Sequence, residues 1–129
     1  MFLLIFTLLR PCFCIVAEKT DEEPLFEEFK GALTEQYACQ ELIASCGPVP
    51  YYWSAENSRG EVDFLVQSAG AVYAIEVKAE ENLRAKSLRS FKEKYPEVQA
   101  RRFSLFDYRE QDWLTNVPLY LMGNTGLWL

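Results

Sequence analysis

The sequence predicts one domain of the mixed α/β class, and three observations support this. Its 129 residues suit a single domain with a core of its own. Hydrophobic residues make up 50% of the chain, which excludes a disordered polypeptide. Helical and strand-like periodicities alternate, in the order helix, three strands joined by hairpins, helix and two further strands. We assign the domain to residues 24–122, after an apolar segment and acidic linker at 1–23 and before a tail at 123–129.

The first helix is predicted to run from Pro24 to a stop at Gly47-Pro48, because proline suits a first helical turn and a Gly-Pro pair ends a helix. Between these points apolar residues recur at helical spacing, namely Leu25, Phe26, Phe29, Leu33 and Tyr37. An aromatic strand then starts at Tyr51-Tyr52-Trp53 and enters a turn. These rings are expected to pack in the core, and stacking on bases is the alternative.

The rest of the chain supplies two strands, a helix and two more strands. Residues 60–80 contain both strands of a hairpin, with a turn at Ala69-Gly70. The second helix is predicted to start at Asn82 or Ser87 and to end before Pro96, with a buried side formed by Leu88, Phe91 and Tyr95. Residues 101–108 and 117–122 are predicted to be the last two strands.

Charge is distributed unevenly along the chain. The net charge of -6 argues against a protein that binds nucleic acid by bulk attraction. Residues 1–61 hold four basic and ten acidic residues, whereas residues 78–102 hold eight basic and four acidic ones. The second region could bind a polyanion that the whole molecule repels at long range.

The composition also limits the chemistry. The chain has no histidine, and its four cysteines form no C-x-x-C pair, so zinc sites and histidine catalysis are not expected. Hydrolysis would have to use carboxylates, lysine or a hard metal ion. Cys39 and Cys46 lie on or just after the helical pattern and suit small buried thiols. We therefore expect a reducing, cytoplasmic environment.

The N-terminal segment is strongly apolar but is not typical of a targeting sequence. Arg10 and Pro11 interrupt it, no basic residue precedes it, and no small-residue cleavage site follows. It is also shorter than the ~20 apolar residues that cross a membrane. We expect no membrane association and interpret the segment as a remnant of a larger protein or a misread start, with a signal peptide as the alternative.

The hairpin places charged residues inside two apolar strands. With the turn at Ala69-Gly70, Asp63 should lie opposite Glu76, and Glu61 opposite Lys78. All four would share one face, because side chains alternate with period two. The apolar residues would form the other face, namely Val62, Phe64, Val66, Tyr73, Ile75 and Val77.

Two interpretations of this charged face remain open. A solvated face is common in antiparallel sheets, and a Glu61–Lys78 pair would suit it. The facing carboxylates of Asp63 and Glu76 do not suit it, because they repel and one of them should have a raised pKa. Mg²⁺ or Mn²⁺ between them would remove the conflict, and Lys78 could orient a water or neutralise developing charge. Asp63 and Glu76 are therefore the predicted metal ligands.

These residues carry a resemblance to known proteins. Asp63 followed by Glu76-Val77-Lys78 resembles the D…E-x-K core of the PD-(D/E)XK, restriction-endonuclease-like nucleases. The segments "LFEEFKGALTEQY", "YYWSAENSRGEVDFLV", "AIEVKAEENLRAKSLRSFKEKY" and "RRFSLFDYRE" resemble the C-terminal domain of unknown function, family 4143, that follows an AAA-type ATPase module.

The resemblance covers residues 25–122 and implies a restriction-endonuclease-like mixed sheet. It also implies that Asp63 and Glu76 bind metal, that Lys78 is catalytic, and that Glu35 is an auxiliary acid of the long helix. This chain lacks a phosphate-binding G-x-x-x-x-G-K-[ST] loop, so it holds no ATPase of its own. An ATPase module or another protein is the expected partner.

A basic segment follows the second hairpin strand and could contact DNA. Lys86 and Ser87, at the start of the second helix, could hold a phosphate, and Arg84 and Arg89 would flank them. An ordinary solvated helix face is the alternative. The sequence thus predicts either a metal-dependent nuclease-like domain acting on DNA phosphodiesters or a non-catalytic module that retains the nuclease fold.

Overall fold

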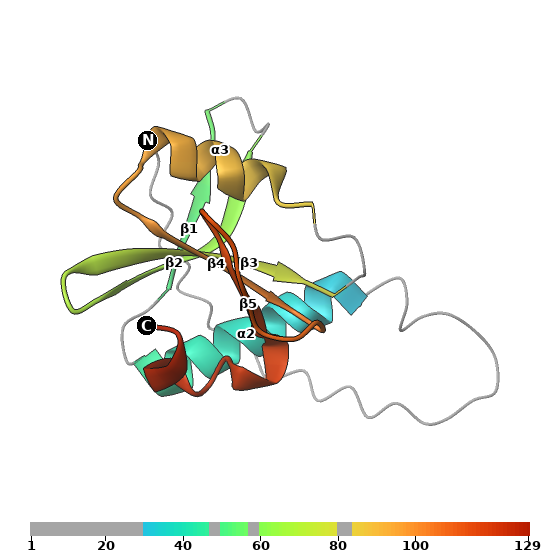
Figure 1. Ribbon diagram of the computed structural model, residues 1–129. Helices are drawn as coiled ribbons and strands as arrows, with labels where there is room; N and C mark the ends of the chain where they lie inside the picture. The colour runs from blue at the N-terminus through green and yellow to red at the C-terminus, as the bar shows by residue number, and fades with distance from the viewer. Residues whose placement is uncertain (1–29, 47–49, 57–59, 80–83) are drawn as a thin grey trace, which may run out of the picture.

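The computed structural model describes residues 30–46, 50–56, 60–79 and 84–129. In these ranges two α-helices lie on opposite faces of one six-stranded sheet (Figure 1), which confirms the mixed α/β class. The sequence predicted five strands, and the sixth is the short β5. The elements are α2 (Lys30–Cys46), β1 (Tyr51–Ser54), β2 (Glu61–Ser68), β3 (Ala71–Lys78), α3 (Lys86–Lys94), β4 (Gln99–Ser104), β5 (Arg109–Glu110) and β6 (Thr115–Pro118).

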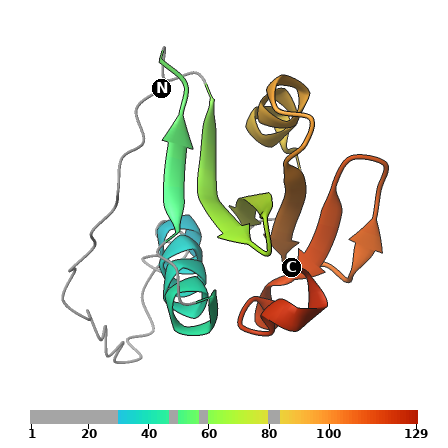
Figure 2. The same ribbon diagram turned by 90° about the vertical axis from the view of Figure 1, so that its left-hand side faces the viewer.

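The sheet has the strand order β1-β2-β3-β4-β6-β5. β1, β2 and β3 pair antiparallel through hairpins, as predicted. β3 and β4 are parallel because α3 carries the chain across one face of the sheet, and β6 continues the parallel run beside β4. Figure 2 shows β4, β5 and β6 to one side and the β1–β2 hairpin to the other. The carboxyl ends of β3, β4 and β6 thus meet at one edge.

The predicted register of the central hairpin is confirmed for the five pairs next to the turn. Ser68 pairs with Ala71, and the pairing continues in register to Phe64 and Ile75. Ala69 and Gly70 both have positive φ, 49° and 82°, as a two-residue type I′ connection requires. The turn residues therefore fix which side chains of β2 and β3 face each other.

Both faces of the sheet are apolar, so the predicted division into a core face and a charged face is wrong. Phe64 and Val66 pack with α2, whereas Val62 packs with α3. A β-bulge places Val62 on the α3 side. Tyr51 pairs with Leu65 and Trp53 with Val62, so β2 has one residue more than β1 in this interval. The extra residue, within Asp63–Phe64, reverses the alternation.

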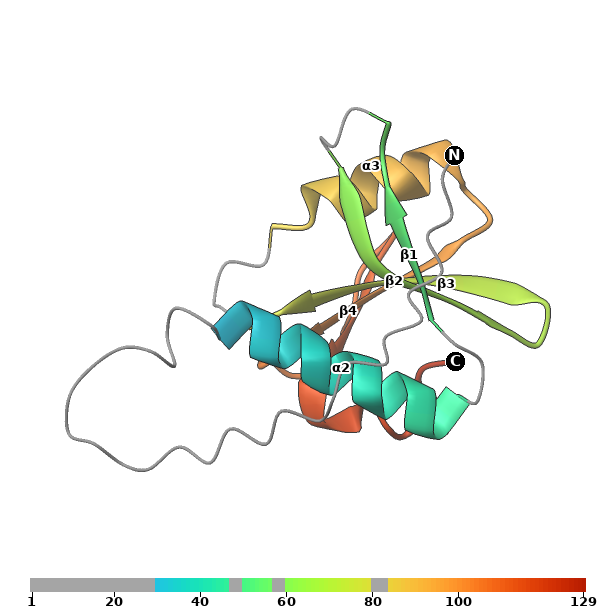
Figure 3. The same ribbon diagram turned by 180° about the vertical axis from the view of Figure 1, so that it is seen from behind.

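Figure 3 shows α2 and α3 on opposite sides of the sheet. One hydrophobic cluster lies under each helix. α2 buries Ala38 and Leu42 and ends at Cys46, just before the predicted Gly47 stop. Its predicted start at Pro24 lies outside the described residues. α3 begins within the predicted range, buries Leu88 and Phe91, and ends before Pro96 as expected. Cys39 is a half-buried free thiol, and the side chain of Cys46 lies outside the description.

The C-terminal strands are shorter than predicted. β4 ends at Ser104, and residues 105–108 form a loop rather than a strand. β6 ends at Pro118 and gives way to a 3₁₀ turn at Leu119–Leu121. Proline has no N–H to donate to a ladder, so a strand often ends at it. A second 3₁₀ turn, Thr125–Leu127, precedes the C-terminus.

The last residues, expected to be a tail, pack on the α2 side of the sheet. Trp128 is buried and lies edge-on to Phe103, with ring centroids 5.0 Å apart. Its indole N–H donates to the Met122 carbonyl at 3.1 Å, and its own carbonyl accepts from Arg101 Nε at 2.9 Å. This segment therefore completes the cluster that contains Leu42.

None of the helices in the described ranges is long and apolar enough to cross a membrane. The interpretations of residues 1–23 concern a part of the chain that the structure does not describe.

Candidate functional site

Asp63 owes its position to the bulge in β2. The paired stretch of β2 and β3 ends at Phe64 and Ile75, so Asp63–Glu76 and Glu61–Lys78, predicted as cross-strand pairs, lie beyond it. The Asp63 carboxylate instead turns toward β3, where Oδ2 accepts the backbone N–H of Val77 at 2.7 Å. The Asp63 side chain thus accepts an N–H that a backbone carbonyl would accept in a regular ladder. This hydrogen bond holds Asp63 beside the end of β3.

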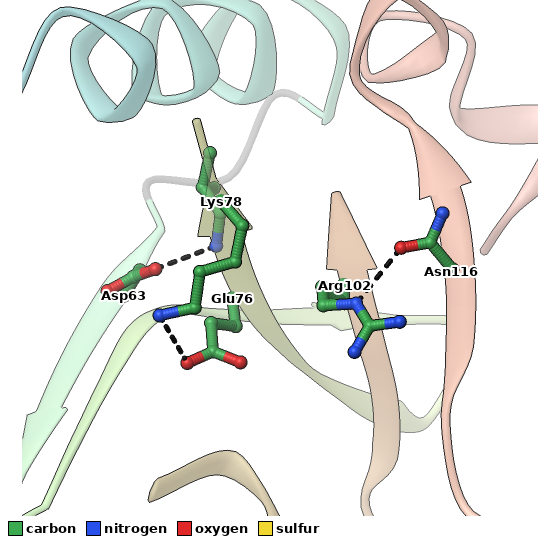
Figure 4. A network of polar contacts seen from close by, with 6 residues as sticks. Asp63, Glu76, Lys78, Arg102 and Asn116 are labelled. Atoms are coloured by element: carbon green, nitrogen blue, oxygen red, sulfur yellow. Dashed lines mark hydrogen bonds and ion pairs between the residues drawn. The ribbon is translucent and has the colours of Figure 1, made fainter. Parts of the chain in front are cut away.

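Glu76 and Lys78 lie two residues apart on β3 and therefore point to the same side. Lys78 Nζ lies 3.0 Å from Glu76 Oε1, so the lysine pairs with Glu76 rather than with Glu61. Glu76 is only 6% exposed. In the described part of the chain its Oε2 is buried and has no hydrogen-bond partner. Figure 4 shows Asp63, Glu76 and Lys78 gathered at this end of β3.

The electrostatics of the two acids follow mainly from burial. Desolvation raises the pKa of Asp63, while the Val77 hydrogen bond and the Lys78 charge oppose the rise. Desolvation also raises the pKa of Glu76, Lys78 opposes it, and the negative charge of Asp63 adds a smaller increase. The sequence predicted a raised pKa for one acid through mutual repulsion. The structure raises both, and burial is the larger cause.

Glu35, near the start of α2, lies within electrostatic range of Asp63, Glu61 and Lys78. Partial desolvation raises the pKa of its exposed carboxyl, Asp63 and Glu61 raise it further, and Lys78 lowers it. Glu61 has a partner that the sequence did not indicate, because it accepts a hydrogen bond from Tyr52. Desolvation and this bond raise the pKa of Tyr52 to about 12. The structure therefore groups the predicted helix acid with the strand residues.

A buried polar network beside the site was missed from the sequence. Arg102 of β4 is the parallel-strand partner of Glu76, and its charge lowers the pKa of that carboxyl. Arg102 Nε donates to Asn116 Oδ1 at 3.0 Å, and the hydroxyl of Ser104 donates to the same oxygen at 2.8 Å. One signal was present: Arg102 alternates with the small residues Ala100 and Ser104, as a residue facing a covered side would.

The residues expected to contact phosphate have different neighbours in the structure. Lys86 and Ser87 line an open hollow of about 580 Å³ between β1 and α3, together with Trp53, Ser54, Ala55, Glu56, Gly60, Ser90, Lys94 and Tyr95. Arg89 pairs with Glu93 at 3.2 Å and lies over the ring of Trp113. Arg84 is exposed just before α3. Trp53 is a core residue against Phe91, as expected for the aromatic strand.

The carboxylates of Asp63 and Glu76 suit a hard divalent cation. The unpartnered Oε2 of Glu76 is an oxygen donor, and such donors are the ligands of Mg²⁺ and Mn²⁺. Across the four described ranges, no three His, Cys, Asp or Glu side chains form a group that could hold a metal. A cation here would need further ligands from water or from a phosphate, which is the usual case for Mg²⁺.

Comparison with known proteins identifies one family. The model of a domain of unknown function, DUF4143, matches residues 30–122, which confirms the part of the resemblance that concerns family 4143. No curated protein and no solved structure matches the chain.

Proposed function

The chain belongs to the DUF4143 family, and from this membership and the geometry of the site we propose that it is a metal-dependent nuclease-like domain acting on DNA phosphodiesters. We further propose that its sheet is of the restriction-endonuclease-like kind and that the domain works with an AAA-type ATPase module in the cytoplasm. Asp63, Glu76, Lys78 and Glu35 are the proposed site residues.

The observation that carries the proposal is the unsatisfied carboxylate of Glu76. A buried charge is retained only with partners, and an unpartnered buried oxygen costs about 1–3 kcal/mol. Lys78 forms an ion pair with Oε1, whereas Oε2 has no hydrogen bond in the described part of the chain. A cation held by Glu76 and Asp63 would remove this cost.

The side chains have distinct proposed roles. Asp63 and Glu76 hold the cation, which supplies Lewis acidity and the activation of a water molecule when bound. The Val77 N–H keeps Asp63 in place through Oδ2. Lys78, about one-third exposed, can leave Glu76 and place its ammonium group beside the charge that develops on the phosphate. Glu35 is exposed at the edge of the site, where it can accept a proton from water.

The test is cleavage of supercoiled plasmid by the full chain in Mg²⁺ or Mn²⁺. Wild type should nick the plasmid, and Lys78→Met should reduce the rate by a factor of ~100 or more, because the positive charge beside the reacting phosphate is lost. Lys78→Met should still bind the metal. Glu97→Gln, an exposed acid after α3, is the matched control and should cleave like wild type.

Wild-type protein that binds Mn²⁺ yet leaves the plasmid intact under all these conditions would contradict the catalytic role. That result would favour the second candidate, a non-catalytic interaction module that keeps the fold. One observation favours this alternative: both acids already have contacts within the chain, Asp63 to the Val77 N–H and Glu76 to Lys78. Its partner would be the ATPase module or another protein.

A further inference from the structure

The loop between β4 and β5 exposes three large apolar side chains within four residues. Leu105, Phe106 and Tyr108 are 64%, 44% and 51% exposed. Single exposed apolar residues are normal, but several together with two aromatic rings mark a contact surface. The charged residues in and after the loop are of both signs, Asp107 and Glu110 against Arg109. Attraction to the surface would therefore come mainly from the rings.

Hydrogen bonds with two buried polar side chains, Ser104 and Asn116, fix the backbone of this loop. Ser104 Oγ accepts the N–H of Phe106 at 3.2 Å. Asn116, which is buried, donates through Nδ2 to the carbonyls of Phe106 at 3.2 Å and Asp107 at 2.9 Å. A loop fixed in this way loses little conformational entropy when it binds a ligand. The rings are therefore presented on a rigid support.

The loop begins next to the candidate site. Lys78 and Ser104 are partners on the parallel strands β3 and β4, so their Cα atoms lie about 5 Å apart. Leu105 follows Ser104 directly. Asn116, which fixes the loop, also accepts from Arg102, whose charge acts on Glu76 (Figure 4). Ligands of parallel sheets bind at the carboxyl ends of the strands, where site and loop meet.

We propose that Phe106 and Tyr108 stack on unpaired bases, so that the preferred substrate is DNA with a single-stranded segment. This inference rests on the proposed function, because it assumes that the site beside the loop receives a phosphodiester. Bases in a duplex are already stacked on one another, whereas bases of a single strand offer free faces to aromatic side chains. The loop gives stacking contact, and the phosphate backbone passes toward Lys78.

A binding assay with labelled DNA tests the stacking surface separately from cleavage. Fluorescence anisotropy of the full chain is measured with a short oligothymidylate and with a blunt duplex, both without divalent cation. The single strand should bind more tightly. Phe106→Ala and Tyr108→Ala should each weaken single-strand binding about tenfold, and the ratio should persist as salt is raised, because stacking is not a counterion effect.

Matched variants separate stacking from general apolarity. Tyr108→Phe keeps the ring and should bind like wild type, although it loses the hydroxyl that donates to Glu110. Phe106→Leu keeps an apolar side chain without a ring and should bind as weakly as Phe106→Ala. Tyr37→Ala removes an exposed ring from α2 and should have no effect. All substituted side chains are exposed, so melting temperatures should stay close to that of wild type.

Three results would overturn the inference. They are equal binding of single strand and duplex, full affinity in Phe106→Leu, and no binding of either DNA. Full affinity in Phe106→Leu would show that an apolar side chain is enough and that no ring stacks on a base. Cleavage of single-stranded DNA that is unchanged in Phe106→Ala would remove the stacking role and leave the proposed function standing. Single-strand binding that depends on Phe106, in a protein that cleaves no DNA, would support the stacking role and contradict the proposed nuclease function.

Discussion

Glu76 is deeply buried and has a lysine beside one carboxylate oxygen, whereas the other oxygen has no hydrogen bond to any residue that the structure describes. Replacing a buried ion pair by apolar residues of similar size is often neutral or stabilising, so such a pair does little for stability. A cation bound at Oε2, as proposed above, would supply the partner that this oxygen lacks among the described residues. Asp63 is the second acid within its electrostatic reach.

The first prediction concerns the response of stability to metal. Mg²⁺ or Mn²⁺ should stabilise wild type by ~2.7 kcal/mol at a free concentration about a hundred times the dissociation constant. Asp63→Asn should lose most of this gain, because an amide is a poor substitute for a carboxylate ligand. It should also raise metal-free stability, since Asn still accepts the Val77 N–H without burying a charge. Melting temperature against metal concentration measures both effects.

Asp107→Asn is the control for this experiment, because it removes an exposed acid in the β4–β5 loop. It should follow the wild-type metal curve. An Asp63→Asn protein with that same curve would show that Asp63 is no ligand and would favour the interaction module.

The second prediction is the pH dependence of the metal-free protein. Burial raises the folded-state pKa of Asp63 above its ordinary value, with Glu61 adding to the rise and Lys78 opposing it. The folded state then binds a proton more tightly than the unfolded state. The stabilisation from that proton is complete below the ordinary carboxyl range and is lost as pH rises through the folded pKa.

Asp63→Asn cannot titrate at this position, so its advantage over wild type should be greatest near neutral pH and should shrink on acidification. Urea unfolding of both proteins at a series of pH values gives the difference in free energy of unfolding. A difference that is constant with pH would contradict the raised pKa of Asp63.

At the scale of single elements, the β2–β3 hairpin decides where the site lies. The Ala69-Gly70 turn sets the register. The bulge at Asp63–Phe64 then interrupts the alternation of side chains, so that the Asp63 carboxylate can turn toward β3. A regular strand would have placed Asp63 on the opposite face from Val62 and Phe64. The bulge instead lets Val62 enter the α3 cluster while Asp63 reaches the end of β3.

The third prediction tests the turn. Ala69 has φ of 49°, where an alanine side chain is strained and Asn or Gly is not. Ala69→Asn creates the Asn-Gly pair that type I′ turns prefer and should stabilise the protein by about 0.5–1 kcal/mol. Gly70→Ala should destabilise it, because φ there is 82°. Urea midpoints compare the two variants with wild type, and a lower midpoint for Ala69→Asn would refute this account of the turn.

At the scale of the whole molecule, the sheet is covered on both faces. The cluster under α2 includes Phe103 and Trp128, and the cluster under α3 includes Trp53 and Phe91. The parallel strands β3, β4 and β6 bring Glu76, Arg102 and Asn116 together from distant parts of the sequence. The polar network beside the site therefore lies in the buried part of the sheet.

The fourth prediction contrasts the two ends of the chain. Trp128→Ala should destabilise the protein by about 3–5 kcal/mol, because it empties a packed position against Phe103 and Tyr73. Deletion of residues 1–20 should leave a cooperative transition, since the predicted helix after Pro24 has its own start signals. Thermal unfolding measures both. Loss of cooperativity in the deletion variant would place the N-terminal segment in the core.

Local patterns in the sequence were enough to predict the mixed α/β class, the central hairpin with its register and the second helix. These features depend on neighbouring residues: a two-residue turn fixes which strand positions pair, and helical spacing needs only one apolar stripe. The same short-range signals singled out Asp63, Glu76 and Lys78.

Only the tertiary structure decided how those residues meet. The bulge results from the pairing of β2 with β1, and the sequence of β2 contains no residue typical of a bulge. The Lys78–Glu76 contact and the burial of both acids depend on helices packed on both faces of the sheet. Arg102 and Asn116 join the site through parallel strands separated by a crossover, and the same network fixes the aromatic loop. Contacts between segments distant in sequence have no local pattern, because they arise from packing and desolvation of the folded chain.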